Sequence, residues 1–260
     1  MGRPKRRRLG QNFLVDASVA QRIAEQLRLE PPRVLEIGPG RGALTQPLLE
    51  RFDRVLALEL DGTLVQPLAA RFGDRGLEVR HADALAEDLD PILAAEAPWQ
   101  VASNLPYSVG TAILRRLMPR HDLFCRLVVM LQREVAHRVV AEPGASGHGL
   151  MALERAAWAD ARLLFDVDRR AFRPPPKVTS SVVVLDLKAP IYDPDVLKRA
   201  LAVAAHALTK PRKMLGNALA PAFGRHRIEA AGLSPSMRPG TVTLDGWVAL
   251  AELLDSPTRP

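Results

Sequence analysis

The sequence predicts an α/β protein in which a mostly parallel sheet with an antiparallel edge is followed by a small all-helical domain. Two observations predict this fold. Strand-like apolar runs alternate with helix-like segments through the first two thirds of the chain, and after Pro190 the sequence is rich in Ala and Leu at helical spacing. Strands linked by helices form right-handed βαβ units and therefore parallel sheets. We expect a sheet domain over 1–189 and a helical domain over 190–260.

The expected parallel strands are short apolar runs that end at glycine, acidic or polar residues: 33–37, 55–60, 77–79, 100–103 and 127–131. Helices capped by Asp16 and Asp61 are expected to begin next to them, because an Asp side chain accepts hydrogen bonds from the first N–H groups of a helix. Further helices are expected near 44–49, 89–95, 109–118 and 133–141. Runs 163–167 and 181–187 are expected to form an antiparallel pair at one edge of the sheet. The helical domain is expected to contain helices near 194–208, 212–220, 225–231 and 245–254.

Composition excludes several classes of protein. The 260 residues are 47% hydrophobic and 25% charged, which is typical of a globular chain. No apolar run approaches the ~18 residues of a membrane span, and no apolar segment follows the basic start as a secretory signal requires. Cys125 is the single cysteine, so no internal disulfide can form. We expect an intracellular, cytoplasmic protein without membrane association.

The net charge of +7 is distributed unevenly. Three tracts contain basic residues and no acidic ones: 1–15, 169–185 and 196–228. They hold 16 of the 36 Lys and Arg residues, so the rest of the chain carries a net charge of −9. This pattern fits either chance clustering of arginine or a surface that binds a polyanion.

A glycine-rich turn lies where the first strand passes into a helix. Gly38, Gly40 and Ala43 fit the dinucleotide fingerprint G-x-G-x-x-G/A, whereas Gly38, Gly40 and Gly42 fit the G-x-G-x-G turn of S-adenosylmethionine (SAM) methyltransferases. A glycine turn without a ligand is the third reading. Acidic residues follow the next two strands: Glu59 can accept ribose hydroxyls, and Asp83 can accept from an adenine amino group. Together these residues predict a nucleoside site at the carboxyl ends of three strands.

Asn104-Leu-Pro-Tyr107 follows the fourth strand and therefore belongs to the same edge. An exocyclic adenine amine is a poor nucleophile because its lone pair is delocalised into the ring. The side-chain oxygen of Asn104 and the carbonyl of Leu105 can accept its two hydrogens and favour the pyramidal nitrogen. Pro106 restricts the backbone that aims this carbonyl, and Tyr107 offers a face for base stacking. The motif favours methyl transfer and has no use in hydride transfer.

A second stacking ring is expected in the segment Phe172-Arg-Pro-Pro-Pro-Lys-Val178. A base extruded from its strand needs two apolar faces, and Phe172 opposite Tyr107 would supply them. Arg173 and Lys177 would then contact flanking phosphates. The alternative reading is a hydrophobic anchor beside a rigid loop.

At these motifs the chain resembles the ribosomal RNA adenine N6-dimethyltransferase family, specifically its KsgA-type small-subunit enzymes. The resemblance covers nearly the whole chain and rests on segments 9–14, 34–45, 104–107, 131–135 and 172–180, with Glu59, Asp83 and a basic pair before Leu215. It implies a Rossmann-like sheet and SAM as cofactor. The implied reaction is the dimethylation of two adjacent adenosines near the 3′ end of small-subunit rRNA, with a role in subunit biogenesis. The implied partner is the small ribosomal subunit, and we expect a monomer.

The resemblance also assigns residues. Gln11, Asn12 and Leu14 would close over the methionine end of SAM, which Gly38 and Gly40 would line. Glu59 would hold the ribose, Asp83 the adenine, and Asn104 the reactive amine at the cofactor. The expected RNA contacts are basic: Arg6, Arg7, Arg8, Arg173, Lys177, Arg212 and Lys213. His148 stands where family members often have arginine, so the role of its segment stays open.

Three alternatives remain. A large-subunit rRNA methyltransferase of the antibiotic-resistance type would share the fold, but Pro39 and the Arg212-Lys213 pair favour the small-subunit reading. A catalytically silent RNA-binding factor would be expected to lose Asn104, Tyr107 or the cofactor acids, and none is lost. DNA adenine methylation is disfavoured because 172–180 matches the rRNA enzymes.

Overall fold

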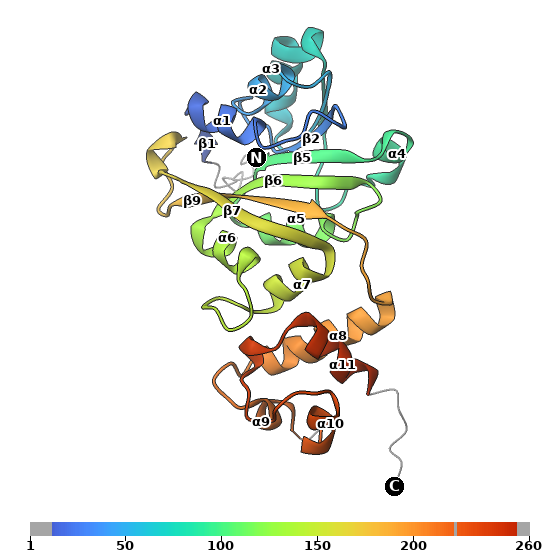
Figure 1. Ribbon diagram of the computed structural model, residues 1–260. Coiled ribbons are helices and arrows are strands. Elements are labelled where there is room, and N and C mark those ends of the chain that lie inside the picture. Colours follow the sequence, from blue (N-terminus) through green and yellow to red (C-terminus); the bar gives the residue numbers. More distant parts are fainter. Residues whose placement is uncertain (1–11, 221–222, 254–260) are drawn as a thin grey trace, which may run out of the picture. The chain divides into compact units, whose positions relative to one another are not determined.

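The computed structural model describes residues 12–220 and 223–253 (Figure 1). The described residues form two compact units, one within 1–136 and 162–187 and the other within 137–161 and 188–260. The second unit therefore includes 137–161, which the expected division at residue 190 assigned to the sheet domain. The chain crosses between the units three times: inside helix α6 (Arg133–Val140), inside strand β7 (Ala159–Val167) and directly after Leu187.

A seven-stranded sheet forms the first unit, in the order β4-β3-β2-β5-β6-β9-β7. The first five strands of this order are parallel, and β9 pairs antiparallel with β6. Besides β7, the strands are β2 (Arg33–Ile37), β3 (Arg54–Glu59), β4 (Leu77–His81), β5 (Trp99–Asn104), β6 (Phe124–Gln132) and β9 (Ser180–Leu187). The predicted α/β fold with an antiparallel edge is confirmed, although β6 and β7 are longer than the apolar runs that predicted them.

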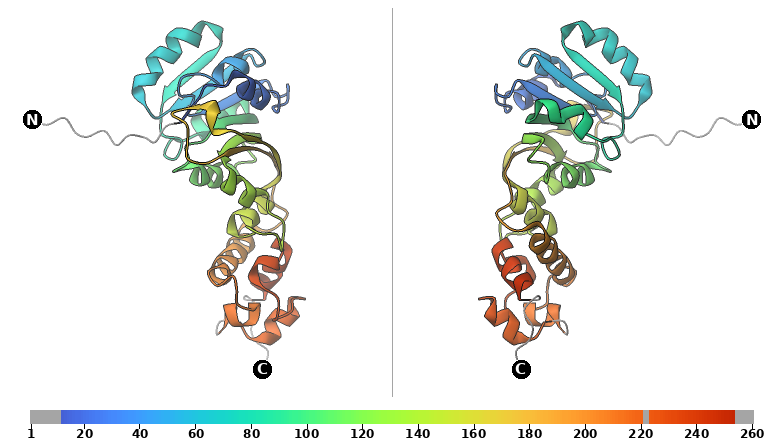
Figure 2. Two further views of the ribbon diagram at one scale, coloured as in Figure 1. Left: turned by 90° about the vertical axis from the view of Figure 1, so that its left-hand side faces the viewer. Right: turned by 90° about the vertical axis from the view of Figure 1, so that its right-hand side faces the viewer.

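Three helices cover one face of this sheet: α1 (Ala17–Ala24), α2 (Thr45–Leu49) and α3 (Gly62–Phe72). Their apolar side chains share one buried cluster with alternate residues of the strands, such as Val34 and Val128. The two predicted caps are present, because Asp16 accepts from the N–H groups of Ser18 and Val19, and Asp61 accepts from that of Thr63. Figure 2 shows these helices packed against the strands.

Helix α5 (Gly110–Leu117) lies on the other face. A Cβ added at Gly110 would lie 3.2 Å from Leu131 and 3.3 Å from Leu105, so the helix backbone rests directly on β6 and the turn after β5. Because side chains alternate along a strand, Leu131 points away from the face that Met130 shares with α1–α3. The sheet is thus buried on both sides, as parallel sheets are.

A short ribbon joins two segments that are far apart in sequence. Strand β1 (Phe13–Leu14) pairs antiparallel with β8 (Phe172–Arg173), with Leu14 opposite Phe172 and Phe13 opposite Arg173. Leu14 and Phe172 are buried in the α1–α3 cluster, whereas Arg173 is exposed. The ribbon therefore attaches the amino-terminal arm, of which residues 12–14 are described, to the segment that precedes β9.

The second unit is helical. Helix α7 (Leu150–Trp158) packs with α8 (Pro194–Leu208) and α11 (Leu244–Glu252) around an apolar cluster that includes the fully buried Trp247. The shorter helices of this unit are α9 (Leu215–Leu219) and α10 (Arg225–Ala230). The helix expected over 212–220 begins only at Leu215, because residues 210–213 form a turn in which Lys213 N–H donates to the Lys210 carbonyl. No helix in the described ranges is long and apolar enough to cross a membrane.

Candidate functional site

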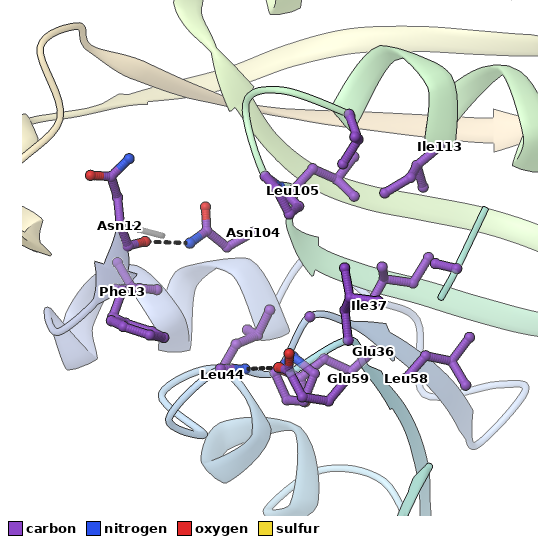
Figure 3. Close-up of a pocket in the computed structure, with 18 of the residues that line it drawn as sticks. Asn12, Phe13, Glu36, Ile37, Leu44, Leu58, Glu59, Asn104, Leu105 and Ile113 are labelled. Atoms are coloured by element: carbon purple, nitrogen blue, oxygen red, sulfur yellow. Dashed lines mark hydrogen bonds between the residues drawn. The ribbon is translucent and has the colours of Figure 1, made fainter. Parts of the chain in front are cut away.

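A pocket lies at the carboxyl ends of four neighbouring strands of the sheet. It is lined by residues that end or follow β2, β3, β4 and β5 and by the amino-terminal arm (Figure 3). Its volume is about 180 Å³. Glu59, Asp83 and Asn104, which the sequence predicted to share this edge, all line the pocket. The strand order explains their meeting, because β4, β3, β2 and β5 are adjacent.

The glycine turn after β2 forms the floor of the pocket. Gly38, Gly40 and Gly42 have φ angles of 67°, 59° and 81°, a region that side chains with a Cβ rarely adopt. A Cβ at Gly38 would meet nothing within 4 Å, whereas one at Gly40 would lie 3.0 Å from the Phe13 ring. A Cβ at Gly42 would lie 2.5 Å from Phe72 of α3. Gly38 therefore leaves open space in the pocket, and Gly40 allows Phe13 of the arm to pack on the turn. Gly42 allows α3 to pack closely against it.

Glu59 ends β3 and is buried, with 3% of its surface exposed. One carboxylate oxygen accepts from Gly40 N–H at 2.9 Å, and the other accepts from Asp61 N–H at 2.8 Å. A carboxylate has about four acceptor positions, so each oxygen retains capacity for a further donor. Held in this way, Glu59 can accept two hydroxyl groups of a bound ligand.

Asp83 lies two residues after β4 and is exposed at the rim of the pocket. Its side chain accepts from Leu85 N–H at 2.9 Å, and its carbonyl accepts from Ala86 and Glu87. These bonds close a tight turn that fixes where the carboxylate stands.

Asn104 ends β5, and its side-chain amide faces the amino-terminal arm. The Nδ2 group donates to the Asn12 carbonyl at 3.2 Å, and the side-chain oxygen points away from Asn12 (Figure 3). The amide therefore has its donor side engaged and its acceptor side turned elsewhere. Leu105 is 1% exposed, and its N–H donates to the Met130 carbonyl, which fixes the backbone just after Asn104.

Tyr107 lines the pocket and is half-buried. Its hydroxyl lies 2.6 Å from the Ser180 hydroxyl at the start of β9, and burial raises the pKa of the phenol. The hydroxyl is thus tied to the sheet, and the ring remains a wall of the pocket.

The amino-terminal arm closes one side of the pocket through Asn12, Phe13 and Leu14. The Phe13 ring covers Gly40 and has the Arg41 guanidinium 4.6 Å from its centre. Phe13 was not predicted as a site residue, although its place in the segment 9–14 could have suggested it. The predicted Gln11 lies outside the described residues.

Glu36 is a second residue that the sequence reasoning missed. It is 1% exposed in β2, lines the pocket, and accepts from the Thr45 hydroxyl at 2.7 Å. Burial raises the pKa of its carboxyl to about 8; the Thr45 hydrogen bond opposes this effect and the charge of Glu59 adds to it. The signal was a carboxyl inside the apolar run Val34-Leu-Glu-Ile37.

The expected pairing of Phe172 with Tyr107 is not found. Phe172 is fully buried among the apolar side chains under α1, and it does not line the pocket. In the β1–β8 ribbon it lies opposite Leu14, whose side chain also enters this core. In this structure Phe172 has the role of a hydrophobic anchor, which was the alternative reading of its segment.

The predicted RNA-contacting residues are distributed over both units. Two of them are exposed in the first unit: Arg173 ends β8, and Lys177 lies between β8 and β9. Arg212 and Lys213 are exposed in the second unit, in the turn before α9 instead of in a helix. Arg6, Arg7 and Arg8 lie outside the described residues.

Comparison with known sequences gives one family. The family model described as ribosomal RNA adenine dimethylase matches residues 2–256. The ribosomal RNA small subunit methyltransferase A of Roseobacter denitrificans is 44% identical, covering 95% of this chain and 90% of that protein. The protein of the same name from Phenylobacterium zucineum is 40% identical, covering 94% and 86%.

Two solved structures share the fold over nearly the whole chain. The 23S rRNA methyltransferase ErmE is 26% identical with a TM-score of 0.73, covering 94% of this chain and 100% of that one. A dimethyladenosine transferase from Plasmodium falciparum is 22% identical with a TM-score of 0.76, covering 92% and 95%.

Proposed function

The chain belongs to the ribosomal RNA adenine dimethylase family, and we propose that its substrate within this family is small-subunit rRNA. The family consists of SAM-dependent methyltransferases, so the protein is an rRNA adenine dimethyltransferase. The proposed targets are two adjacent adenosines near the 3′ end. Relatives named for the small subunit, at 44% and 40% identity over most of both chains, support this choice.

SAM supplies the activated methyl group when bound, and the pocket residues fit it. Gly38 leaves open space above the glycine turn, where a ligand can approach the backbone. Glu59 retains acceptor capacity on both oxygens for the ribose hydroxyls, and Asp83 stands at the rim beyond it for the adenine amino group. Asn12 and Leu14 of the arm and the Asn104 side chain would complete the walls, with Gln11 preceding them.

The observation that carries the proposed methyl transfer to an adenine amine is the orientation of the Asn104 side chain. Its Nδ2 group is engaged by the Asn12 carbonyl, which leaves the side-chain oxygen to accept from the amine of a target adenine. The Leu105 carbonyl would accept the second hydrogen, in a direction that Pro106 restricts. Tyr107 would stack on the base. These contacts would favour the nucleophilic form of the nitrogen and hold it for the methyl group that SAM would supply, and the methylated nitrogen would lose its proton afterwards.

The large ribosomal subunit is the second candidate, because the 23S rRNA methyltransferase ErmE matches the whole fold. Its identity of 26% is lower than that of the small-subunit relatives. We propose further that the enzyme acts as a monomer in the cytoplasm, during small-subunit biogenesis. The exposed Arg173, Lys177, Arg212 and Lys213 would contact rRNA phosphates, so binding should weaken as salt is raised.

Labelled SAM tests the proposal, with under-methylated small and large subunits in parallel reactions. The expected result is labelled dimethyladenosine in small-subunit rRNA, at two adjacent positions, and none in the large subunit. Label confined to large-subunit rRNA would overturn the substrate assignment. Absence of label from both, in a preparation that binds S-adenosylhomocysteine (SAH), would overturn the proposed activity on isolated subunits.

A further inference from the structure

The turn after β4 places Asp83 at the rim of the pocket, but its own bonds reach only over residues 83–87. The Arg116 side chain on α5 contacts this turn from another element of the fold. The Arg116 guanidinium donates from one terminal nitrogen to the Leu85 carbonyl and from the other to the Glu87 carbonyl. One planar fork therefore grips the turn on both sides of Ala86.

Helix α5 is also tied to the catalytic motif at its beginning. The Pro106 carbonyl accepts from Val109 and Gly110, so the helix starts directly from the Asn104–Tyr107 segment. Ile113, one turn before Arg116, is 3% exposed and lines the pocket. The same helix thus begins at the proposed substrate motif and holds the proposed adenine-binding turn near its other end.

We propose that Arg116 is a positioning residue that sets the Asp83 carboxylate for the adenine of SAM. The proposal rests on the function proposed above for Asp83. Arginine suits this role because its fork donates two parallel hydrogen bonds in a fixed plane, whereas the lysine ammonium is a point charge on a flexible stem. Without the Arg116 guanidinium, the turn 83–87 keeps its internal hydrogen bonds, but these two hydrogen bonds no longer fix its position relative to α5.

The first test compares Arg116→Gln and Arg116→Lys with Arg115→Gln, a matched change at an exposed neighbour on the same helix. We expect Arg116→Gln to raise the Kd for SAH, measured by calorimetry, by about tenfold, with a similar rise in KM for SAM and little change in kcat. Arg116→Lys should recover only part of the affinity. A role in stability alone would lower the Tm of Arg116→Gln and leave the Kd unchanged at temperatures well below it, and that result would overturn the proposal.

A double-mutant cycle with Asp83→Ala then tests the route. If Arg116 acts through Asp83, adding Arg116→Gln to Asp83→Ala should weaken SAH binding little further. Independent, additive losses would show that Arg116 acts elsewhere and would reject the proposal. If Asp83→Ala alone left the Kd unchanged, the role proposed for Asp83 would fail first. The two failures are therefore distinguishable.

Discussion

The two sides of the pocket are anchored in different ways. On the glycine-turn side, Glu59 accepts from the N–H groups of Gly40 and Asp61, which belong to turns of the sheet itself. On the other side, Asn104 donates to the carbonyl of Asn12, 92 residues earlier in the chain. The hydrogen bonds that hold Glu59 come from turns of the sheet, whereas the hydrogen bond that holds Asn104 depends on the amino-terminal arm, which packs on Gly40 through Phe13. Cofactor binding and methyl transfer should therefore respond separately to mutation.

Asn104→Ala should give the largest effect. Removing the acceptor for the target amine should lower kcat for methyl transfer by about a thousandfold, the scale seen when one preorganised polar group is lost from a transition state. The SAH Kd, measured by calorimetry, should change far less, because Glu59 and its turns are untouched. Activity within about tenfold of wild type would remove Asn104 from the reaction.

Glu59→Ala should affect the opposite side. Loss of two hydrogen bonds to the ribose should weaken SAH binding by about a hundredfold, while kcat at saturating SAM falls less. Glu59→Gln retains one acceptor oxygen and should lie between wild type and Ala. Since Gly40 and Asp61 also lose a partner, thermal unfolding should be measured in parallel. A loss confined to kcat would contradict the assignment of Glu59 to the cofactor.

Phe13→Ala tests the seat of the arm. The ring fills the space above Gly40, so truncation should loosen Asn12 and thereby Asn104. We expect about a tenfold fall in kcat and a smaller rise in the SAH Kd, with Phe13→Leu closer to wild type because it keeps more of the packing volume. Equal losses in kcat and SAH affinity would show that the two sides are not independent.

Glu36→Gln should have the smallest effect on activity but a clear effect on stability. The folded-state pKa near 8 lies above the ordinary 4.5, so between these values the folded protein binds more protons than the unfolded chain. The contribution of this group to the free energy of unfolding therefore falls as pH rises from about 4.5 past 8. The Gln side chain does not titrate. Urea unfolding should therefore show that the free energy of unfolding of Glu36→Gln increases relative to that of wild type from pH 5 to pH 9. A constant difference across this range would mean that Glu36 does not titrate as described.

The sequence predicted the pocket best where position follows from strand order. Glu59, Asp83 and Asn104 each end or follow a strand, and the carboxyl ends of neighbouring parallel strands meet at one edge. Glu36 was missed because an apolar pattern identifies a strand but does not show which group forms a hydrogen bond with a buried carboxyl inside it. Its partner Thr45 lies beyond the glycine turn.

The sequence pattern did not predict short strands or places where one element passes directly into the next. Phe172 belongs to a two-residue strand, in which a shift of one residue moves a side chain from the core to solvent, so its direction depended on a partner strand far away. Helix α7 had no side-chain cap at Gly149 to mark its start, and it passes directly into β7. Its apolar face packs on α8 and α11, which explains why 137–161 groups with the helical unit.

The β1–β8 ribbon also determines when the pocket can be completed during synthesis. Phe13 emerges from the ribosome early, but its partner Arg173 follows about 160 residues later, roughly 10–30 s at ordinary rates of translation. Before then, β2–β5 can bring Glu59, Asp83 and Asn104 together, but the arm has no partner strand to hold Asn12 beside Asn104. A nascent chain that stops short of Phe172 can therefore bring its strand-end residues together, but it cannot yet hold Asn12 beside Asn104 through the ribbon.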